Sequence, residues 1–180
     1  MFSHPAVFVH VLCLFNCMML HGCVPDQFGV GIVVPLVKDS LGNVNDSANY
    51  RGITLSVFLS KMFEYCLINK YENFMPSSDM QFGFKKKMGC SHAIFALHQC
   101  VDYFVKTGSS VFMAALDATK AFDRVNHIKL FHRLLDKGMP VFVVKLIANW
   151  YSKNMSTVRW NNHHSEFFHV KSGVRQGGVL

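Results

Sequence analysis

The pattern of hydrophobic and polar positions divides the chain into alternating helical and extended segments. The first is the apolar stretch Ala6–Leu20, which predicts a core helix that ends at Gly22, with Pro25 beyond it as a stop. No Lys or Arg precedes this stretch, it contains His10 and Asn16, and it is shorter than the roughly 20 residues that a membrane span needs. A core helix is therefore preferred, while a secreted or membrane-inserted product stays an alternative.

Strand patterns occur at both ends of the remaining chain. The β-branched stretch Phe28–Val37 predicts a strand in which Pro35 favours an edge position or a break. After a polar loop over residues 38–49, Tyr50–Leu55 predicts a second, short strand. Further along, two strands, Ser156–Trp160 and Glu166–Val170, are expected to form a hairpin around Asn161, Asn162, His163 and His164. The two histidines are interpreted as part of a polar turn, with metal binding as the alternative.

Helices are predicted between these strands, because apolar residues there recur at helical spacing. The predicted boundaries are N-caps at Ser56, Ser91 and Asn126, stops at Gly108 and Gly138, and a further helix from Pro140 to about Tyr151.

One segment stands apart because an uninterrupted apolar run ends in a carboxylate. Val111–Leu116 predicts a strand buried on both faces; Asp117 follows at once and Asp123 six residues later. A carboxylate at the end of such a strand is held at the rim of a sheet, where it can bind a Mg²⁺ ion that acts on phosphates. The alternative is that Asp117 caps the turn and Asp123 caps the next helix.

Composition and charge narrow the class of protein. A chain of 180 residues with 51% hydrophobic residues is long enough for one domain with a core and is not a disordered tail. Its net charge of +7 makes a polyanionic partner a candidate.

Residues 81–88 combine Lys85, Lys86 and Lys87 with two aromatic residues, a pattern that suits a nucleic-acid backbone with stacked bases; a solvated loop is the alternative. The Gly-rich basic residues 172–180 can approach a phosphate or a base pair closely.

The cysteines give no sign of a zinc site. No two of the six cysteines have CxxC spacing, and no His pair lies at zinc-finger distance from them. They are interpreted as reduced, mostly buried thiols of an intracellular protein, nuclear or cytoplasmic.

Taken together, four segments resemble, in order, the motifs of reverse transcriptases, and they look most like those of non-LTR (LINE-type) retrotransposons. The four segments are ANYRGITLSVFLSKMFE (48–64), QFGFKKKMGCSHAI (81–94), ALDATKAFDRVNHIKLFHRL (115–134) and SGVRQGGVL (172–180). The stretches 14–25 and 32–39 also look like the lead-in of that family. The resemblance therefore covers nearly the whole chain.

This resemblance implies an α+β chain with the right-hand polymerase fold, comprising the reverse transcriptase fingers and the start of the palm. The implied divisions are 1–107 as fingers, 108–123 as the first palm strand and its turn, 124–171 as the return to the fingers, and 172–180 as the start of the next palm segment. The implied partners are an RNA template, a DNA primer and dNTPs, without a membrane.

The resemblance also implies roles for individual residues. Asp117 matches the family's first catalytic aspartate, which binds Mg²⁺ together with the main-chain carbonyl of Ala118; the complete enzyme holds two ions. Phe122 matches the aromatic residue that packs against the nucleotide sugar, and Asp123 is given a structural role. The remaining implied contacts are Lys38 and Arg51 with the triphosphate, Gln176 and Gly177 with the nucleotide and template base, and Lys85, Lys86, Lys87 and Arg175 with nucleic acid.

One departure from the family pattern limits the expected activity. The family completes its metal site with two adjacent aspartates in a Tyr/Phe-Ala-Asp-Asp motif, and no Asp-Asp pair occurs in this sequence. Since a two-metal site needs several carboxylates, we expect a fragment of an RNA-directed DNA polymerase that is inactive alone. The complete enzyme would use two-metal nucleotidyl transfer for retrotransposition. The alternative is a non-catalytic, nucleic-acid-binding remnant of a retroelement.

Overall fold

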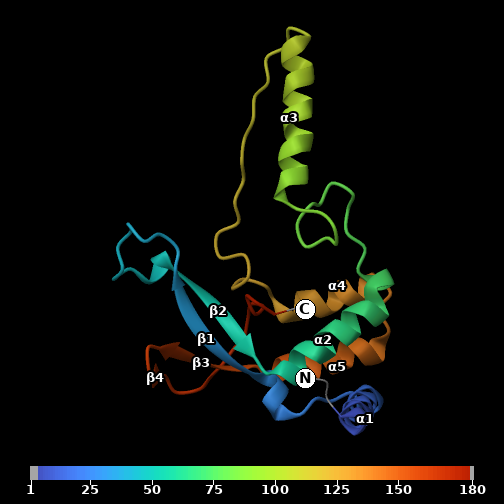
Figure 1. The fold of residues 1–180 in the computed structure, drawn as a ribbon. Helices are drawn as coiled ribbons and strands as arrows, with labels where there is room; N and C mark the ends of the chain where they lie inside the picture. The colour runs from blue at the N-terminus through green and yellow to red at the C-terminus, as the bar shows by residue number, and fades with distance from the viewer. Residues whose placement is uncertain (1–3, 179–180) are drawn as a thin grey trace. The chain divides into compact units, whose positions relative to one another are not determined.

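The computed structural model describes residues 4–178, which combine helices with one mixed sheet (Figure 1). The α-helices are α1 (Pro5–His21), α2 (Phe58–Tyr71), α3 (Cys90–Lys106), α4 (His127–Asp136) and α5 (Val141–Ser152). The strands are β1 (Val30–Val37), β2 (Tyr50–Ser56), β3 (Met155–Trp160), β4 (His163–His164) and β5 (Phe168–His169). Short 3-10 helices are η1 (Asp26–Gly29), η2 (Ser47–Asn49) and η3 (Glu72–Phe74). This architecture is compatible with the predicted α+β class.

The chain divides into two compact units. Unit 1 comprises Met1–Phe74 and Lys120–Leu180, and unit 2 comprises Met75–Thr119. The sheet and α1, α2, α4 and α5 belong to unit 1, whereas α3 belongs to unit 2.

The sheet of unit 1 is organised around β1. This strand pairs antiparallel with β2 and parallel with β3, and β4 and β5 both pair antiparallel with β3. The pairing with β3 covers only Val30–Val33, so Pro35 has a strand neighbour on the β2 side alone. A proline is tolerated there because its missing N–H is not needed by a second neighbour. The predicted edge position is wrong for the strand as a whole, since β1 lies between β2 and β3.

Aromatic side chains form the core of unit 1. Phe63 of α2 lies between Phe15 of α1 and Trp150 of α5, at centroid distances of 4.9 Å and 5.7 Å. Trp150 also packs against Phe28 at 5.9 Å and donates its indole N–H to the carbonyl of that residue at 2.9 Å. These contacts hold α1, α2 and α5 to the turn that leads into β1.

Several predicted helix boundaries are confirmed. α1 ends at Gly22, which takes the left-handed conformation (φ 63°), although only Phe15 and Met18 of this helix are buried, so the predicted core helix is buried on one side only. The side chain of Asn126 caps α4 by accepting a hydrogen bond from the amide of Lys129 at 3.0 Å. The stop at Gly138 and the start at Pro140 are also as predicted. The chain does turn back after β3, but the polar turn is shorter than predicted, because His163 and His164 form β4 and pair with Trp160 and Arg159. Only Phe168–His169 of the predicted second strand is a strand.

Other predicted caps are wrong by a residue or two. Ser56 is the last residue of β2, and α2 is capped by Val57 without a side-chain hydrogen bond. Ser91 lies inside α3, which follows Gly89. The prediction of mostly buried cysteines is wrong as well, since all six are exposed. Among the described residues, no helix combines the length and the apolar character that crossing a membrane requires.

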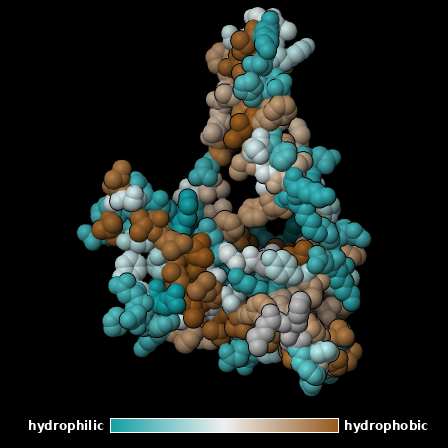
Figure 2. Space-filling model, in the orientation of Figure 1, coloured by the Kyte–Doolittle hydropathy of each residue, from teal (hydrophilic) through white to brown (hydrophobic). Residues whose placement is uncertain are grey.

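The largest correction concerns Val111–Leu116, which forms no strand. All six residues are exposed, with Phe112 at 94% and Leu116 at 99%. A strand depends on a neighbouring chain for its backbone hydrogen bonds, and no segment of the described chain pairs with this one. α3 of the same unit likewise has no buried residue, and apolar side chains are visible along its surface in Figure 2.

Candidate nucleotide-binding site

Two distant parts of unit 1 are joined where the segment 172–174 meets the turn that begins at Phe122. The amide of Val174 donates to the carbonyl of Phe122, and the amide of Gly173 donates to the carbonyl of Val125, both at 2.8 Å. A pair of short backbone hydrogen bonds fixes the two segments against each other. The structure thus brings the C-terminal motif to the turn that follows the Asp117 region in the chain.

Gly173 is required at this junction for two reasons. Its φ is +86°, a conformation that L side chains rarely adopt. A Cβ here would also lie 2.9 Å from the carbonyl oxygen of Phe122 and 3.0 Å from Cα of Asp123, which are backbone atoms that cannot swing aside. The imidazole of His127 adds a contact of 2.7 Å to the carbonyl of Gly173. Close packing against the backbone of Phe122 and Asp123 therefore explains why glycine occupies position 173.

Gln176 and Gly177, further along the same motif, lie along the free edge of β2. The amide of Thr54 donates to the carbonyl of Gln176 at 2.8 Å. Gly177 has φ +100°, and a Cβ on it would lie 3.3 Å from Cγ2 of Ile53. Strand alternation places Ile53 and Arg51 on the same face of the sheet. Gln176 and Gly177 are thus brought next to the strand that carries Arg51.

The two predicted triphosphate contacts lie at the end of the β1–β2 hairpin where the loop 38–49 joins the two strands. Arg51 is exposed and pairs in register with Leu36, two residues before Lys38 in the chain. Lys38 is also exposed, and its Nζ donates to the carbonyl of Ala48 at 2.7 Å. Two cationic side chains, one on β2 and one directly after β1, are a suitable pair for an anionic ligand.

The predicted metal ligands lie in unit 2. Asp117 and Ala118 are exposed and belong to neither a helix nor a strand. A carboxylate and a carbonyl are the oxygen donors that Mg²⁺ takes. However, the described residues contain no group of three or more His, Cys, Asp or Glu side chains that could hold a metal ion. Asp117 and Ala118 therefore do not by themselves fit a two-ion site, and we derive no reaction step through a metal.

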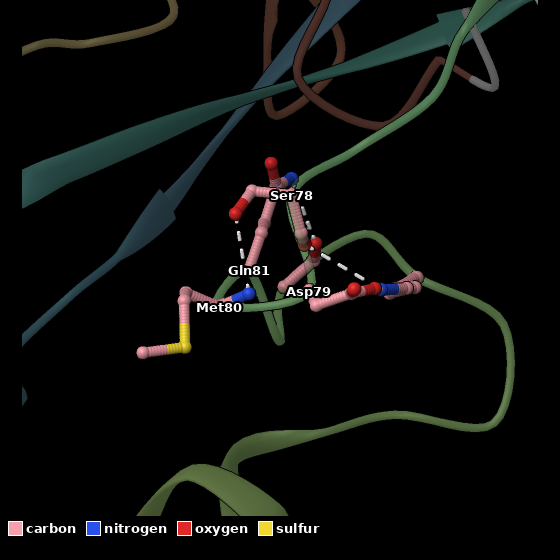
Figure 3. Close-up of polar contacts among 6 residues, drawn as sticks. Ser78, Asp79, Met80 and Gln81 are labelled. Carbon is pink, nitrogen blue, oxygen red and sulfur yellow. Dashed lines mark hydrogen bonds and ion pairs between the residues drawn. The ribbon is translucent and has the colours of Figure 1, made fainter.

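The basic loop of unit 2 is ordered by its own polar contacts (Figure 3). The hydroxyl and the carbonyl of Ser78 accept hydrogen bonds from the amides of Met80 and Gln81, at 3.2 Å and 3.0 Å. Nζ of Lys85 lies 3.4 Å from both the carbonyl of Ser78 and a carboxylate oxygen of Asp79. Lys85 is thus engaged within the loop.

The rest of this loop is more open to solvent. Lys86 and Lys87 are exposed, and Phe84 is 94% exposed. An exposed ring beside exposed cations is the combination that the sequence suggested for nucleic acid.

Arg175 points into the protein, although the resemblance implied a contact with nucleic acid. Its guanidinium donates to the carbonyls of Phe28 (3.4 Å) and Gly29 and to Oδ1 of Asn154 (3.0 Å). Burial lowers the pKa of Arg175, and the charges of Glu64 and Tyr151 oppose this shift. These contacts anchor Arg175 in unit 1, and its expected contact with nucleic acid stays a prediction.

A buried polar cluster around Arg175 was missed by sequence reasoning. It consists of Glu64 of α2, Tyr151 of α5 and Asn154, which together with Arg175 line a cavity of about 30 Å³. Burial raises the pKa of Tyr151, as does Glu64, while Arg175 lowers it. A signal existed: Glu64 falls on the buried stripe of α2, four residues after the buried Ser60.

The sequence is similar to a known protein family and to several known proteins over most of its length. Residues 38–180 match the model of the family described as reverse transcriptase (RNA-dependent DNA polymerase). The chain is 27% identical, over 180 residues, to the probable RNA-directed DNA polymerase from transposon X-element of Drosophila melanogaster, covering 96% of this chain and 19% of that protein. It is 25% identical, over 132 residues, to the retrovirus-related Pol polyprotein from type-2 retrotransposable element R2DM of the same organism, covering 73% of this chain and 12% of the relative.

A third relative is the probable RNA-directed DNA polymerase from transposon BS, also of Drosophila melanogaster, which is 24% identical over 177 residues, 96% of this chain and 19% of that protein. The chain spans about a fifth or less of the length of these curated relatives. The predicted relationship is confirmed, and the family model covers well over half of the sequence. The chain belongs to the reverse transcriptase family, whose members are RNA-directed DNA polymerases.

Proposed function

We propose that this chain supplies the nucleotide-binding part of a reverse transcriptase of the non-LTR retrotransposon type, which copies RNA into DNA by two-metal nucleotidyl transfer. In this proposal the chain contributes fingers and the start of a palm to a right-hand polymerase fold. Its substrates are a dNTP, an RNA template and a DNA primer. Asp117 and the carbonyl of Ala118 provide part of the Mg²⁺ ligands, and further carboxylates are needed to hold two ions.

The observation that supports this proposal most is the convergence of the C-terminal motif on β2. Gln176 and Gly177 lie beside the strand that bears Arg51, and the same segment is bonded to the turn at Phe122. A dNTP needs cations for its phosphates and close backbone approach for its base and sugar. Unit 1 contains both kinds of group on adjoining elements.

Two further roles complete the proposal. Phe122 packs against the sugar of the incoming nucleotide, and Lys38 joins Arg51 at the triphosphate. Lys86, Lys87 and Phe84 contact the nucleic-acid backbone and bases from the basic loop. The whole chain carries a net charge of +7, which favours association with a polyanion.

A non-catalytic remnant that only binds nucleic acid is the second candidate, and the incomplete set of metal ligands among the described residues favours it. The two candidates differ in their dependence on Asp117. A remnant needs the basic side chains and not this carboxylate, whereas a polymerase needs both.

The test is primer extension by a chimaera in which residues 38–180 replace the matching segment of the X-element relative. With Mg²⁺, an RNA template and labelled dNTPs, the chimaera should extend a DNA primer, and Asp117→Asn should reduce the rate by roughly 10²- to 10³-fold, corresponding to several kcal/mol of charge stabilisation. Asp123→Asn is the matched control, since this nearby exposed carboxylate has no proposed metal role, and it should leave most activity.

The 180-residue chain alone should extend no primer at any Mg²⁺ concentration. Incorporation by the isolated chain that disappears in Asp117→Asn would contradict the view that its metal site is incomplete. Equal activity of the Asp117→Asn and Asp123→Asn chimaeras would refute the catalytic assignment and favour the remnant.

A further inference from the structure

The side chain of Arg175 in the C-terminal motif is directed into unit 1, and we propose that it is a positioning residue for the nucleotide site. Its guanidinium binds the η1–β1 turn and Asn154, and in doing so it fixes Gln176 and Gly177 along the edge of β2. This inference rests on the proposed function for what the site binds. The anchoring itself is independent of any ligand.

The acceptors of the guanidinium are themselves fixed by the fold. The carbonyl of Phe28 also accepts the indole N–H of Trp150, a residue that is 4% exposed. Gly29 packs so closely on Lys153 that a Cβ would lie 2.6 Å from the carbonyl carbon of that residue. Arg175 therefore binds a rigid part of the core, and it does so at two adjacent carbonyls.

Arg175 packs beside Gly31 of β1. A Cβ on Gly31 would lie 3.7 Å from Nε of Arg175 and 2.7 Å from Cγ2 of Thr54. The same Thr54 donates its amide to Gln176, the residue that follows Arg175. The buried side chain at position 175 and the backbone contact at position 176 thus meet the sheet at the same place, so fixing one constrains the other.

The guanidinium of Arg175 is engaged by the protein itself, because its terminal nitrogens donate to the carbonyls of Phe28 and Gly29 and to Oδ1 of Asn154. Arg175 lines a small cavity together with Glu64, Tyr151 and Asn154. Burying the cation disfavours its charged form, an effect that the charge of Glu64 offsets. A charge held in this way serves the fold around Gln176.

Amide hydrogen exchange on the full 180-residue chain tests the anchoring. In Arg175→Met, the amide of Thr54 should exchange about 10- to 100-fold faster than in the wild type, the range expected for loss of hydrogen bonds from a charged donor. Amides of α5 and those shared by β1 and β2 should keep their protection. Arg175→Lys keeps the charge but not the fork of donors, so it should lie between the two.

Two controls make the result decisive. Arg159→Met removes an exposed arginine of β3 and should leave exchange at Thr54 unchanged. Asn154→Ala removes one acceptor of Arg175 and should reproduce part of the effect. Unchanged protection at Thr54 in both Arg175→Met and Asn154→Ala would overturn the proposal. Equal loss of protection in β1, β2 and α5 in Arg175→Lys and Asn154→Ala would also overturn it, because Arg175 would then support the fold as a whole.

The nucleotide is tested separately in the chimaera. Arg175→Lys should raise KM for dNTP by about tenfold with a smaller change in kcat, because it misplaces a binding contact and leaves Asp117 untouched. An unchanged KM would overturn the positioning role even if the exchange result holds. An unmodified chimaera that extends no primer would refute the proposed function, while hydrogen exchange would still decide the anchoring.

Discussion

Replacement of Gly173 by alanine tests whether the C-terminal motif is built around the turn at Phe122. The added Cβ has two separate costs. At φ +86° an L residue loses about 1–2 kcal/mol relative to glycine. The contacts of 2.9 Å and 3.0 Å with backbone atoms of Phe122 and Asp123 add an overpacking cost of about 1–3 kcal/mol.

Gly22→Ala is the matched control. Gly22 also has a positive φ, +63°, but a Cβ there would meet no atom within 4 Å. This variant therefore has the conformational cost alone. Both variants gain about 0.4–1 kcal/mol from the reduced freedom of the unfolded chain, so this gain cancels in the comparison. The expected difference between them is the overpacking cost, about 1–3 kcal/mol of unfolding free energy.

Urea denaturation followed by tryptophan fluorescence measures this difference. Both tryptophans of the chain, Trp150 and Trp160, lie in unit 1, as do both glycines. A loss of this size is a large share of the roughly 5–15 kcal/mol that stabilises a typical domain, so the midpoint should shift clearly. If the two variants unfold within about 0.5 kcal/mol of each other, the close approach of Gly173 to the turn is refuted.

Three other predictions follow from particular side chains. In the active chimaera, Phe122→Val should lower the ratio of dNTP to rNTP incorporation efficiency by on the order of 10²-fold, because a rigid ring under the sugar excludes a 2′-hydroxyl; an unchanged ratio would leave Phe122 as packing only. The isolated chain should self-associate through its exposed apolar segments, and Phe112→Lys combined with Leu116→Lys should shift sedimentation towards monomer; a monodisperse wild-type chain would contradict this. Burial raises the pKa of Tyr151 above its ordinary value of 10.0. Its contribution to stability is therefore fully present below about pH 10 and is lost as the pH rises through the raised pKa. In urea denaturation, Tyr151→Phe should weaken this alkaline loss of stability, whereas Tyr65→Phe, at an exposed tyrosine, should not.

The helices and strands of unit 1 were predictable because their signals are local. Asn126 caps α4 through its own side chain, and Gly22 and Gly138 take the left-handed conformation that glycine permits. The strand predicted at Val111–Leu116 is absent from the structure, because its signal is not local in the same sense. Its apolar sequence records a preference for burial, but a strand forms only where another segment offers backbone partners.

The candidate site was predictable to the extent that its residues act through the backbone. The Gly-rich residues 172–180 were expected to approach a phosphate or a base pair closely, which stays a prediction. In the structure Gly173 and Gly177 each have a positive φ and lie close to other segments of the chain. The direction of Arg175 could not be predicted. A basic residue in a Gly-rich segment has the same sequence pattern whether it faces a phosphate or a buried carbonyl, and only the packing of residues more than 140 positions away along the chain decides between them.

The contacts of residues 173–177 are evidence about the architecture of the candidate site and not about its catalysis. Gly173 is fixed by the turn at Phe122, Arg175 by the carbonyls before β1, and Gln176 by Thr54. Each constraint comes from the folding of unit 1 and would be kept by a chain that binds nucleotide without reacting, or by one that binds nothing. The proposed chemistry depends on Asp117, which lies in unit 2 and shares none of these constraints. Stability and hydrogen-exchange measurements on the motif therefore test the architecture of the site, and only variants of Asp117 test the catalysis.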